Sequence, residues 1–118
     1  MIEVNAITEN NLKPMRSEGF SLQYQYAEAL AKLPAVTYYN LTDQESFRTD
    51  NTEMSSKCRV QIDIWTLKRS EMSRGSIRVN ELMQADGWMR EMSRDMPREA
   101  ESQTYHRTMR FVKEIWEV

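Results

Sequence analysis

Residues 58–69 read Cys-Arg-Val-Gln-Ile-Asp-Ile-Trp-Thr-Leu-Lys-Arg, and this stretch decides the fold. Four apolar side chains alternate with a set that is polar until Trp65; the apolar ones are Cys58, Val60, Ile62 and Ile64. Only a strand can use a period of two residues, because its successive side chains point to opposite faces. The stretch therefore predicts a strand over residues 58–67, with one face on a core and the other on water or a partner. We expect Trp65 to be part of the core, because Leu67 lies on the same face.

Two helices are expected around this strand. One follows it almost without a linker, over about residues 70–86, and Gly87 is placed to end it. The other is expected from Phe20 to Leu33, where apolar residues recur on one helical face and Pro34 would stop the helix.

Three further strands are expected, over residues 36–41, 88–95 and 104–118, and the last would contain a β-bulge near residues 111–113. The stretch 42–56 is almost entirely polar and is interpreted as a long connection. Residues 1–16 are interpreted as an N-terminal arm or a short irregular helix outside the central core. The order of elements predicts a single α+β domain over residues 17–118, a mostly antiparallel four-stranded sheet with two helices packed on one face.

The composition of the 118 residues narrows the function. Hydrophobic residues make up 40% and charged residues 29%, as in a soluble folded domain. The net charge of −2 argues against a general nucleic-acid binder. No apolar run reaches the length of a membrane span, and the first residues do not read as an export signal. The single cysteine, Cys58, excludes an internal disulfide, fits a reducing cytoplasm and is expected to be buried on the apolar face of its strand.

No motif in the chain predicts catalysis. His106 is the only histidine, so it has no partner at metal-ligand spacing, and the three glycines stand too far apart for a phosphate loop. We therefore expect no enzyme activity, no metal and no cofactor. An enzyme that uses His106 with Tyr105 or Glu91 stays open as a minor alternative.

The chain carries more large aromatic residues than so small a core encloses, so some of them should contact a partner. Arg90, Arg94 and Arg98 are four apart and would share one face of either a helix or a strand. The acidic stretch 42–56 and the basic segment 88–98 would complement each other across a contact between subunits. The expected interface residues are Tyr39, Asp43, Glu45, Phe47, Asp50, Glu53, Trp88, Arg90 and Arg94.

From Phe20 to its end, the chain resembles the tail-completion proteins of long-tailed bacteriophages, which include tail-terminator and tail-to-head joining proteins. Three segments carry the resemblance: Pro-Ala-Val-Thr-Tyr-Tyr at 34–39, Val-Gln-Ile-Asp-Ile-Trp at 60–65 before its helix, and Tyr-His-Arg-Thr-Met-Arg-Phe at 105–111. The resemblance implies an α+β virion subunit, assembled in the host cytoplasm, that forms a homo-hexameric ring in the neck. Such a ring ends the tail tube, joins it to the head connector or stopper protein, and lets DNA pass through its lumen without specific binding.

The resemblance implies no catalytic residue and no membrane contact. Besides the enzyme alternative, two non-catalytic functions stay open. One is a head-completion (stopper) protein of the same neck. The other is a small dimeric α+β binding or regulatory domain, in which strand edges pair between two subunits.

Overall fold

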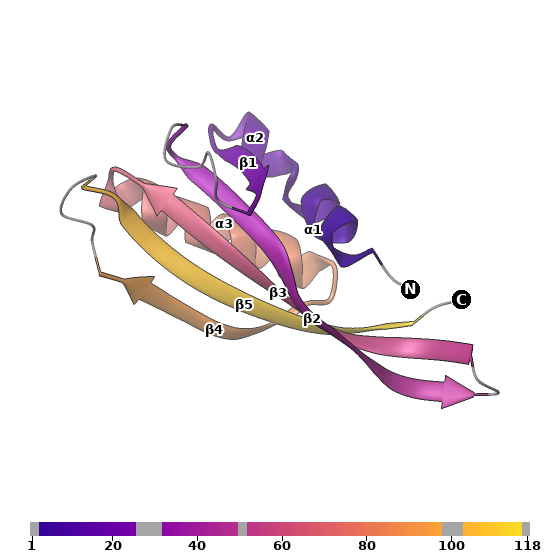
Figure 1. The fold of residues 1–118 in the computed structure, drawn as a ribbon. Coiled ribbons are helices and arrows are strands. Elements are labelled where there is room, and N and C mark those ends of the chain that lie inside the picture. The colour runs from indigo at the N-terminus through magenta and orange to yellow at the C-terminus, as the bar shows by residue number, and fades with distance from the viewer. Residues whose placement is uncertain (1–2, 26–31, 50–51, 98–102, 117–118) are drawn as a thin grey trace.

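A computed structural model describes residues 3–25, 32–49, 52–97 and 103–116, with the backbone alone at 42–49 and 52–54. These residues form a mixed sheet with helices on one face (Figure 1). The elements in chain order are α1 (Val4–Leu12), α2 (Pro14–Ser17), β1 (Ser21–Tyr24), β2 (Ala35–Thr49), β3 (Thr52–Thr66), α3 (Arg69–Ala85), β4 (Met89–Met96) and β5 (Tyr105–Trp116).

The α+β class is confirmed, but the described sheet has five strands, in the order β1-β2-β3-β5-β4, where four were expected. The additional strand, β1, pairs in parallel with the start of β2, and the other three pairs are antiparallel. The strand expected at 58–67, the helix at 70–86 and the strand at 88–95 are confirmed as β3, α3 and β4.

The core lies between the sheet and the two longer helices, α1 and α3. Cys58, Val60, Ile62 and Ile64 are fully buried on this face, as their alternation predicted. Gly87 adopts a φ of +88° directly after α3, which is the left-handed conformation expected of a glycine that ends a helix.

A second glycine, Gly75, permits a close contact between α3 and the start of β1. A Cβ atom built at Gly75 would lie 2.9 Å from the ring of Phe20, which is closer than real Cβ contacts. None of the described helices has the length and apolar character that a membrane crossing requires.

The helix expected from Phe20 to Leu33 is wrong at its start, because Ser21–Tyr24 forms β1. Gly19, at a φ of +95°, turns the chain out of α2, and Phe20 and Leu22 are then buried on one side of an extended segment. Their separation by two residues is the period of a strand, whereas the helix was expected from the spacing of Leu22 with the residues that follow it. Residues 26–31 of that prediction lie outside the described residues, and its last two residues, Lys32 and Leu33, are not helical.

The expectation that residues 1–16 stay outside the core is also wrong. Val4, Leu12 and Met15 are at most 1% exposed and pack with the sheet. Thr8 interrupts the apolar series in the sequence, but it is buried too, because its hydroxyl donates a hydrogen bond of 2.9 Å to the Val4 carbonyl oxygen. The segment therefore contributes a packed helix.

The connection expected at 42–56 is instead the second half of β2 and the first part of β3. These strands pair from Ala35 and Trp65 outward to Thr49 and Thr52. The polar composition suggested a loop because the outer part of this hairpin extends beyond the helices, where no core requires apolar side chains (Figure 1).

The bulge expected near residues 111–113 of β5 is not there, and a bulge lies instead in the neighbouring strand β4. The register between β3 and β5 is unbroken, whereas Glu91 is an extra residue between two paired residues of β4. Because a bulge shifts the alternation, Arg90 pairs with Phe111 of the core face and Arg94 pairs with Thr108 of the opposite face. The expectation that the two arginines share one face is therefore wrong.

The packing of α1 leads to a first prediction. Replacing Leu12 with Ala removes a fully buried side chain and should lower the free energy of unfolding by about 2–5 kcal/mol. The exposed neighbour Lys13, replaced with Ala, is the matched control and should change it by less than about 0.5 kcal/mol. Urea unfolding followed by circular dichroism measures both, and equal stability of the two variants would show that α1 is dispensable.

Candidate functional site

The sheet face opposite α1 and α3, here called the open face, carries a polar cluster that joins β3 to β5. The cluster is built from three successive cross-strand pairs, Gln61 with Arg110, Asp63 with Thr108, and Trp65 with His106. Because residues two apart on a strand share a face, the unbroken register brings all six side chains to the same side.

Asp63 is the centre of this cluster and is 6% exposed. The Nε2 atom of His106 lies 2.8 Å from its Oδ1, and the Thr108 hydroxyl donates to the same oxygen over 2.7 Å. The Gln61 amide donates to Oδ2 over 3.1 Å. Burial alone would raise the pKa of Asp63, but these donors outweigh it and hold the pKa below its ordinary value of 3.8.

Trp65 closes one end of the cluster. Its ring stacks on that of His106, with centroids 3.6 Å apart and planes inclined by 13°. Its indole N–H donates to the Thr37 hydroxyl over 3.2 Å, and it packs with Ala35 and Leu33. Trp65 is thus buried, as expected, at 9% exposure, but Leu67 is 54% exposed, and the cover comes from His106 and Leu33.

The partner of His106 is Asp63, and neither Tyr105 nor Glu91 fills that role. Glu91 instead forms an ion pair with Arg59, at 3.0 Å. An aspartate beside a histidine can orient a general base, but the carboxylate here also holds the Thr108 hydroxyl, so the polar groups are engaged with one another. Among the described residues, no three candidate ligands converge on a metal position. The arrangement is therefore suited to fixing the β3–β5 register.

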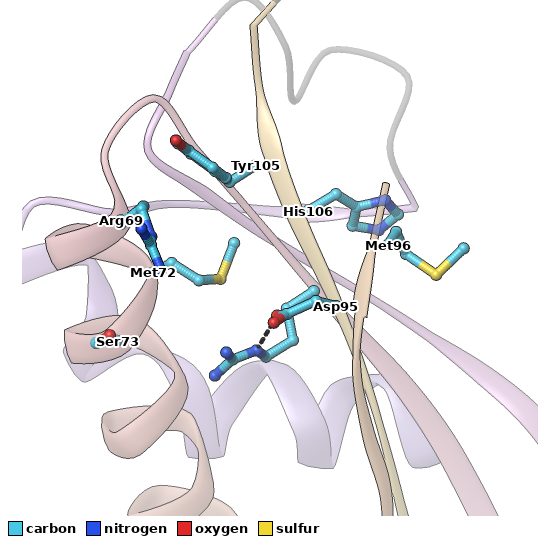
Figure 2. A pocket seen from close by; sticks show the side chains of 8 residues that line it. Arg69, Met72, Ser73, Asp95, Met96, Tyr105 and His106 are labelled. Atoms are coloured by element: carbon cyan, nitrogen blue, oxygen red, sulfur yellow. Dashed lines mark hydrogen bonds and ion pairs between the residues drawn. The ribbon is translucent and has the colours of Figure 1, made fainter. Parts of the chain in front are cut away.

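Two hollows flank the cluster. One, of about 440 Å³, lies over the open face and is lined by Gln25, Tyr39, Gln61, Asp63, Trp65 and His106. The other, of about 370 Å³, lies between the start of α3, the last residues of β4 and the first residues of β5 (Figure 2). In the second hollow, Arg107 donates to Asp95 over 2.7 Å and to the Ser76 hydroxyl over 2.8 Å. Its guanidinium group therefore connects β5 to both β4 and α3.

The β2–β3 hairpin is the second distinctive feature. Within the described residues, β5 pairs with β3 as far as Ser55, and the sheet beyond that point consists of β2 and β3. Register shifts occur in the hairpin between Asn40 and Thr42, and on both sides of Phe47. The molecule measures 53 × 26 × 22 Å, and the hairpin extends along its length beyond the helices (Figure 1).

The structure separates the expected interface residues into groups. Asp43, Glu45 and Phe47 belong to β2 and Glu53 to β3, all in the hairpin, whereas Asp50 lies outside the described residues. Tyr39 is half-buried on the open face. Arg90 and Arg94 are exposed on β4, which is separated from β2 by β3 and β5 and forms the opposite edge of the sheet. One subunit therefore does not bring the acidic and basic groups together.

The expectation for Trp88 is wrong. It was expected at the interface, but it is 2% exposed and packs in the core, with its indole N–H donating to Asp86 over 3.1 Å. The turn at Gly87 directs the following residue inward, under the C-terminal end of α3. Its side chain is therefore unavailable at the surface as an aromatic anchor.

The sequence analysis did not single out Asp63, Gln61 or Thr108. A signal was present, because Asp63 is a lone acidic residue between Ile62 and Ile64 in a buried strand, and a buried charge requires partners. The comparison with known family models gives no match, and the search of curated proteins gives none either.

The charge at Asp63 leads to a second prediction. Since its folded pKa lies below the unfolded value, its ionisation stabilises the fold above pH 3.8, and this contribution is lost as the pH falls through the folded pKa. Asp63→Asn should lower the free energy of unfolding by about 1–3 kcal/mol at neutral pH and reduce its loss in acid. The matched control, Asp95→Asn at an exposed ion pair, should cost at most about 1 kcal/mol. Denaturant titrations between pH 2 and 7 give both quantities, and an unchanged acid slope in Asp63→Asn would contradict this role.

The stack on Trp65 leads to a third prediction. Trp65→Ala should lower the free energy of unfolding by about 3–5 kcal/mol, because a large buried ring is lost. The same change at Trp116, which is 56% exposed, should cost less. Thermal melting compares the two, and a Trp65→Ala variant that melts like the parent would place this ring outside the core.

Proposed function

We propose that this chain is a ring-forming structural subunit in the neck of a long-tailed bacteriophage. The ring ends the tail tube, joins it to the head connector or stopper protein, and surrounds the path of the DNA. The proposal combines the resemblance of the 34–39, 60–65 and 105–111 segments with one structural observation, the long β2–β3 hairpin.

The hairpin supports assembly because its outer part lacks the packing that normally stabilises strands. A two-stranded ribbon is marginally stable by itself in water. Beyond Ser55 the described ribbon has neither a third strand nor a helix beside it (Figure 1). Contact with a second molecule would supply the missing packing, and a hairpin that projects from the body is well placed for such contact.

The resemblance implies six copies in the ring. A closed ring requires a heterologous contact, in which one patch of each subunit meets a different patch of the next. The hairpin and β4 provide two different patches, toward opposite edges of the sheet. The net charge of −2 suits a ring through which DNA slides, since a surplus of fixed positive charge would hold the phosphates.

The dimeric binding domain is the second candidate, and it has one observation in its favour. β4 forms an edge of the sheet, and an exposed edge can pair with its own copy around a two-fold axis. Mass measurement in solution distinguishes the two functions, since a stable dimer at all concentrations would favour the binding domain. The ring predicts a monomer or a hexamer.

The ring leads to a fourth prediction. Deleting the gene from the virus that encodes it should leave filled heads and separate tails of uncontrolled length, because nothing ends the tube or joins it. Supplying the protein from a plasmid should restore complete particles. Electron microscopy gives both results, and antibody labelling should place the protein at the head–tail junction. Normal particles after deletion, or absence of the protein from purified particles, would refute the proposal.

A further inference from the structure

The hollow between α3, β4 and β5 is lined by two arginines, Arg69 and Arg107, and by one carboxylate, Asp95. Arg69 and Ser73 are four residues apart on α3, so they share one face of the helix, and both line the hollow (Figure 2). Asp95 and Arg107 enter it from the two strands. These side chains give the hollow a surplus of positive charge.

The guanidinium group of Arg107 is held in place on the sheet side of the hollow. Its Nε donates to Asp95 over 2.7 Å, and its Nη1 donates to the Ser76 hydroxyl over 2.8 Å. Ser76 is buried and is itself fixed, because its hydroxyl donates to the Met72 carbonyl oxygen over 2.7 Å. A guanidinium has five N–H donors. Nη2 of Arg107 makes no hydrogen bond with the described residues and is not closed off from solvent.

The helix side of the hollow also has unused donors. Arg69 and Ser73 are exposed, and neither has a hydrogen bond or an ion pair within the part of the chain that the structure describes. Arg69 therefore has no carboxylate to neutralise it there. Donors thus face the hollow from two walls that are fixed by different elements.

Donors on two walls suit a phosphate group, because its oxygens point in several directions and each accepts charge-assisted hydrogen bonds. A planar carboxylate has two oxygens, and a single guanidinium can satisfy both. Met72 and Met96 complete the lining with flexible apolar side chains, which can pack against the organic part of a ligand. The volume of about 370 Å³ is near the lower end of the range for small-molecule sites.

We propose that this hollow binds the terminal phosphate group of a small phosphorylated molecule. Arg69, Ser73 and Nη2 of Arg107 donate to the phosphate oxygens, while Ser76 keeps the guanidinium of Arg107 in position. Asp95 also orients Arg107, but its negative charge opposes the anion and limits the affinity. This inference goes beyond the proposed ring and does not depend on it.

Titration of the purified chain with inorganic phosphate tests the site, at pH 8 and constant ionic strength. A phosphate group then carries about two negative charges. Nuclear magnetic resonance should show saturable binding by the parent. Arg69→Ala should weaken it about tenfold or more, because charge-assisted hydrogen bonds are lost. The matched control, Arg90→Ala, removes the same charge from an exposed position outside the hollow and should change the affinity less than about twofold, since distant charges are screened.

Asp95→Asn should change the affinity in the opposite direction. The asparagine keeps an oxygen that accepts from Nε of Arg107, but it removes the charge that opposes the anion. Phosphate should therefore bind up to about fivefold more tightly, which is the range of an exposed charge interaction. A variant that merely loosened the fold would bind more weakly, so an increase reports the charge itself. Unchanged or weaker binding by a folded Asp95→Asn variant would show that the anion does not lie beside Asp95.

Two further anions identify the ligand group. Dimethyl phosphate represents the diester of a nucleic-acid backbone and carries one charge, and acetate represents a carboxylate. Both should bind about tenfold more weakly than inorganic phosphate, because they offer fewer charged oxygens. Equal affinity for dimethyl phosphate would assign the hollow to a backbone diester, and equal affinity for acetate would assign it to a carboxylate. Either result would overturn the proposal, and so would binding that does not saturate or that Arg69→Ala and Arg90→Ala weaken equally. The ring is tested separately, by gene deletion.

Discussion

Asp63 receives hydrogen bonds from His106 and Thr108 across the β3–β5 pair. These bonds fix the register of the two strands, and both the composition of the core face and the position of α3 depend on that register. A shift of one residue would turn Ile62 and Ile64 away from the helices and place the Asp63 carboxylate in the core. The apolar face and the polar face of β3 therefore select the same alignment. The helix α3 is attached directly to the end of β3, so its position follows from the same alignment.

The elements that could be predicted from the sequence are those whose pattern has one physical solution. β3 alternates strictly, and α3 repeats over several turns before a glycine. The predictions failed where one pattern fits two structures. Leu22 fits a strand by its spacing from Phe20 and a helix by its spacing from Tyr26. Thr8 interrupts an apolar series that is nevertheless buried. The hairpin was missed because strands outside the core lack the apolar alternation by which strands are recognised.

The sequence shows which charged residues are present, but it does not show which residues of the candidate site are in contact. The acidic and basic segments are visible in the sequence, and the structure places them toward opposite edges of the sheet. His106 and Asp63 are 43 residues apart, and only the β3–β5 pairing shows that they meet. The face of Arg90 depends on a bulge of one residue, and the burial of Trp88 depends on the turn at Gly87. No periodicity in the sequence encodes these local changes of direction.

Backbone hydrogen bonds alone give an exposed edge no means of selecting its partner, because every strand offers the same groups. Selection has to come from what differs between edges, namely the length of the regular stretch and the side chains along it. Within the described residues, the bulges limit the regular part of the uncovered edges of β2 and β4 to a few residues. The same bulges disfavour pairing with long regular strands. The irregularities of β2 and β4 thus shorten the edges with which another strand could pair, as far as the described residues show them.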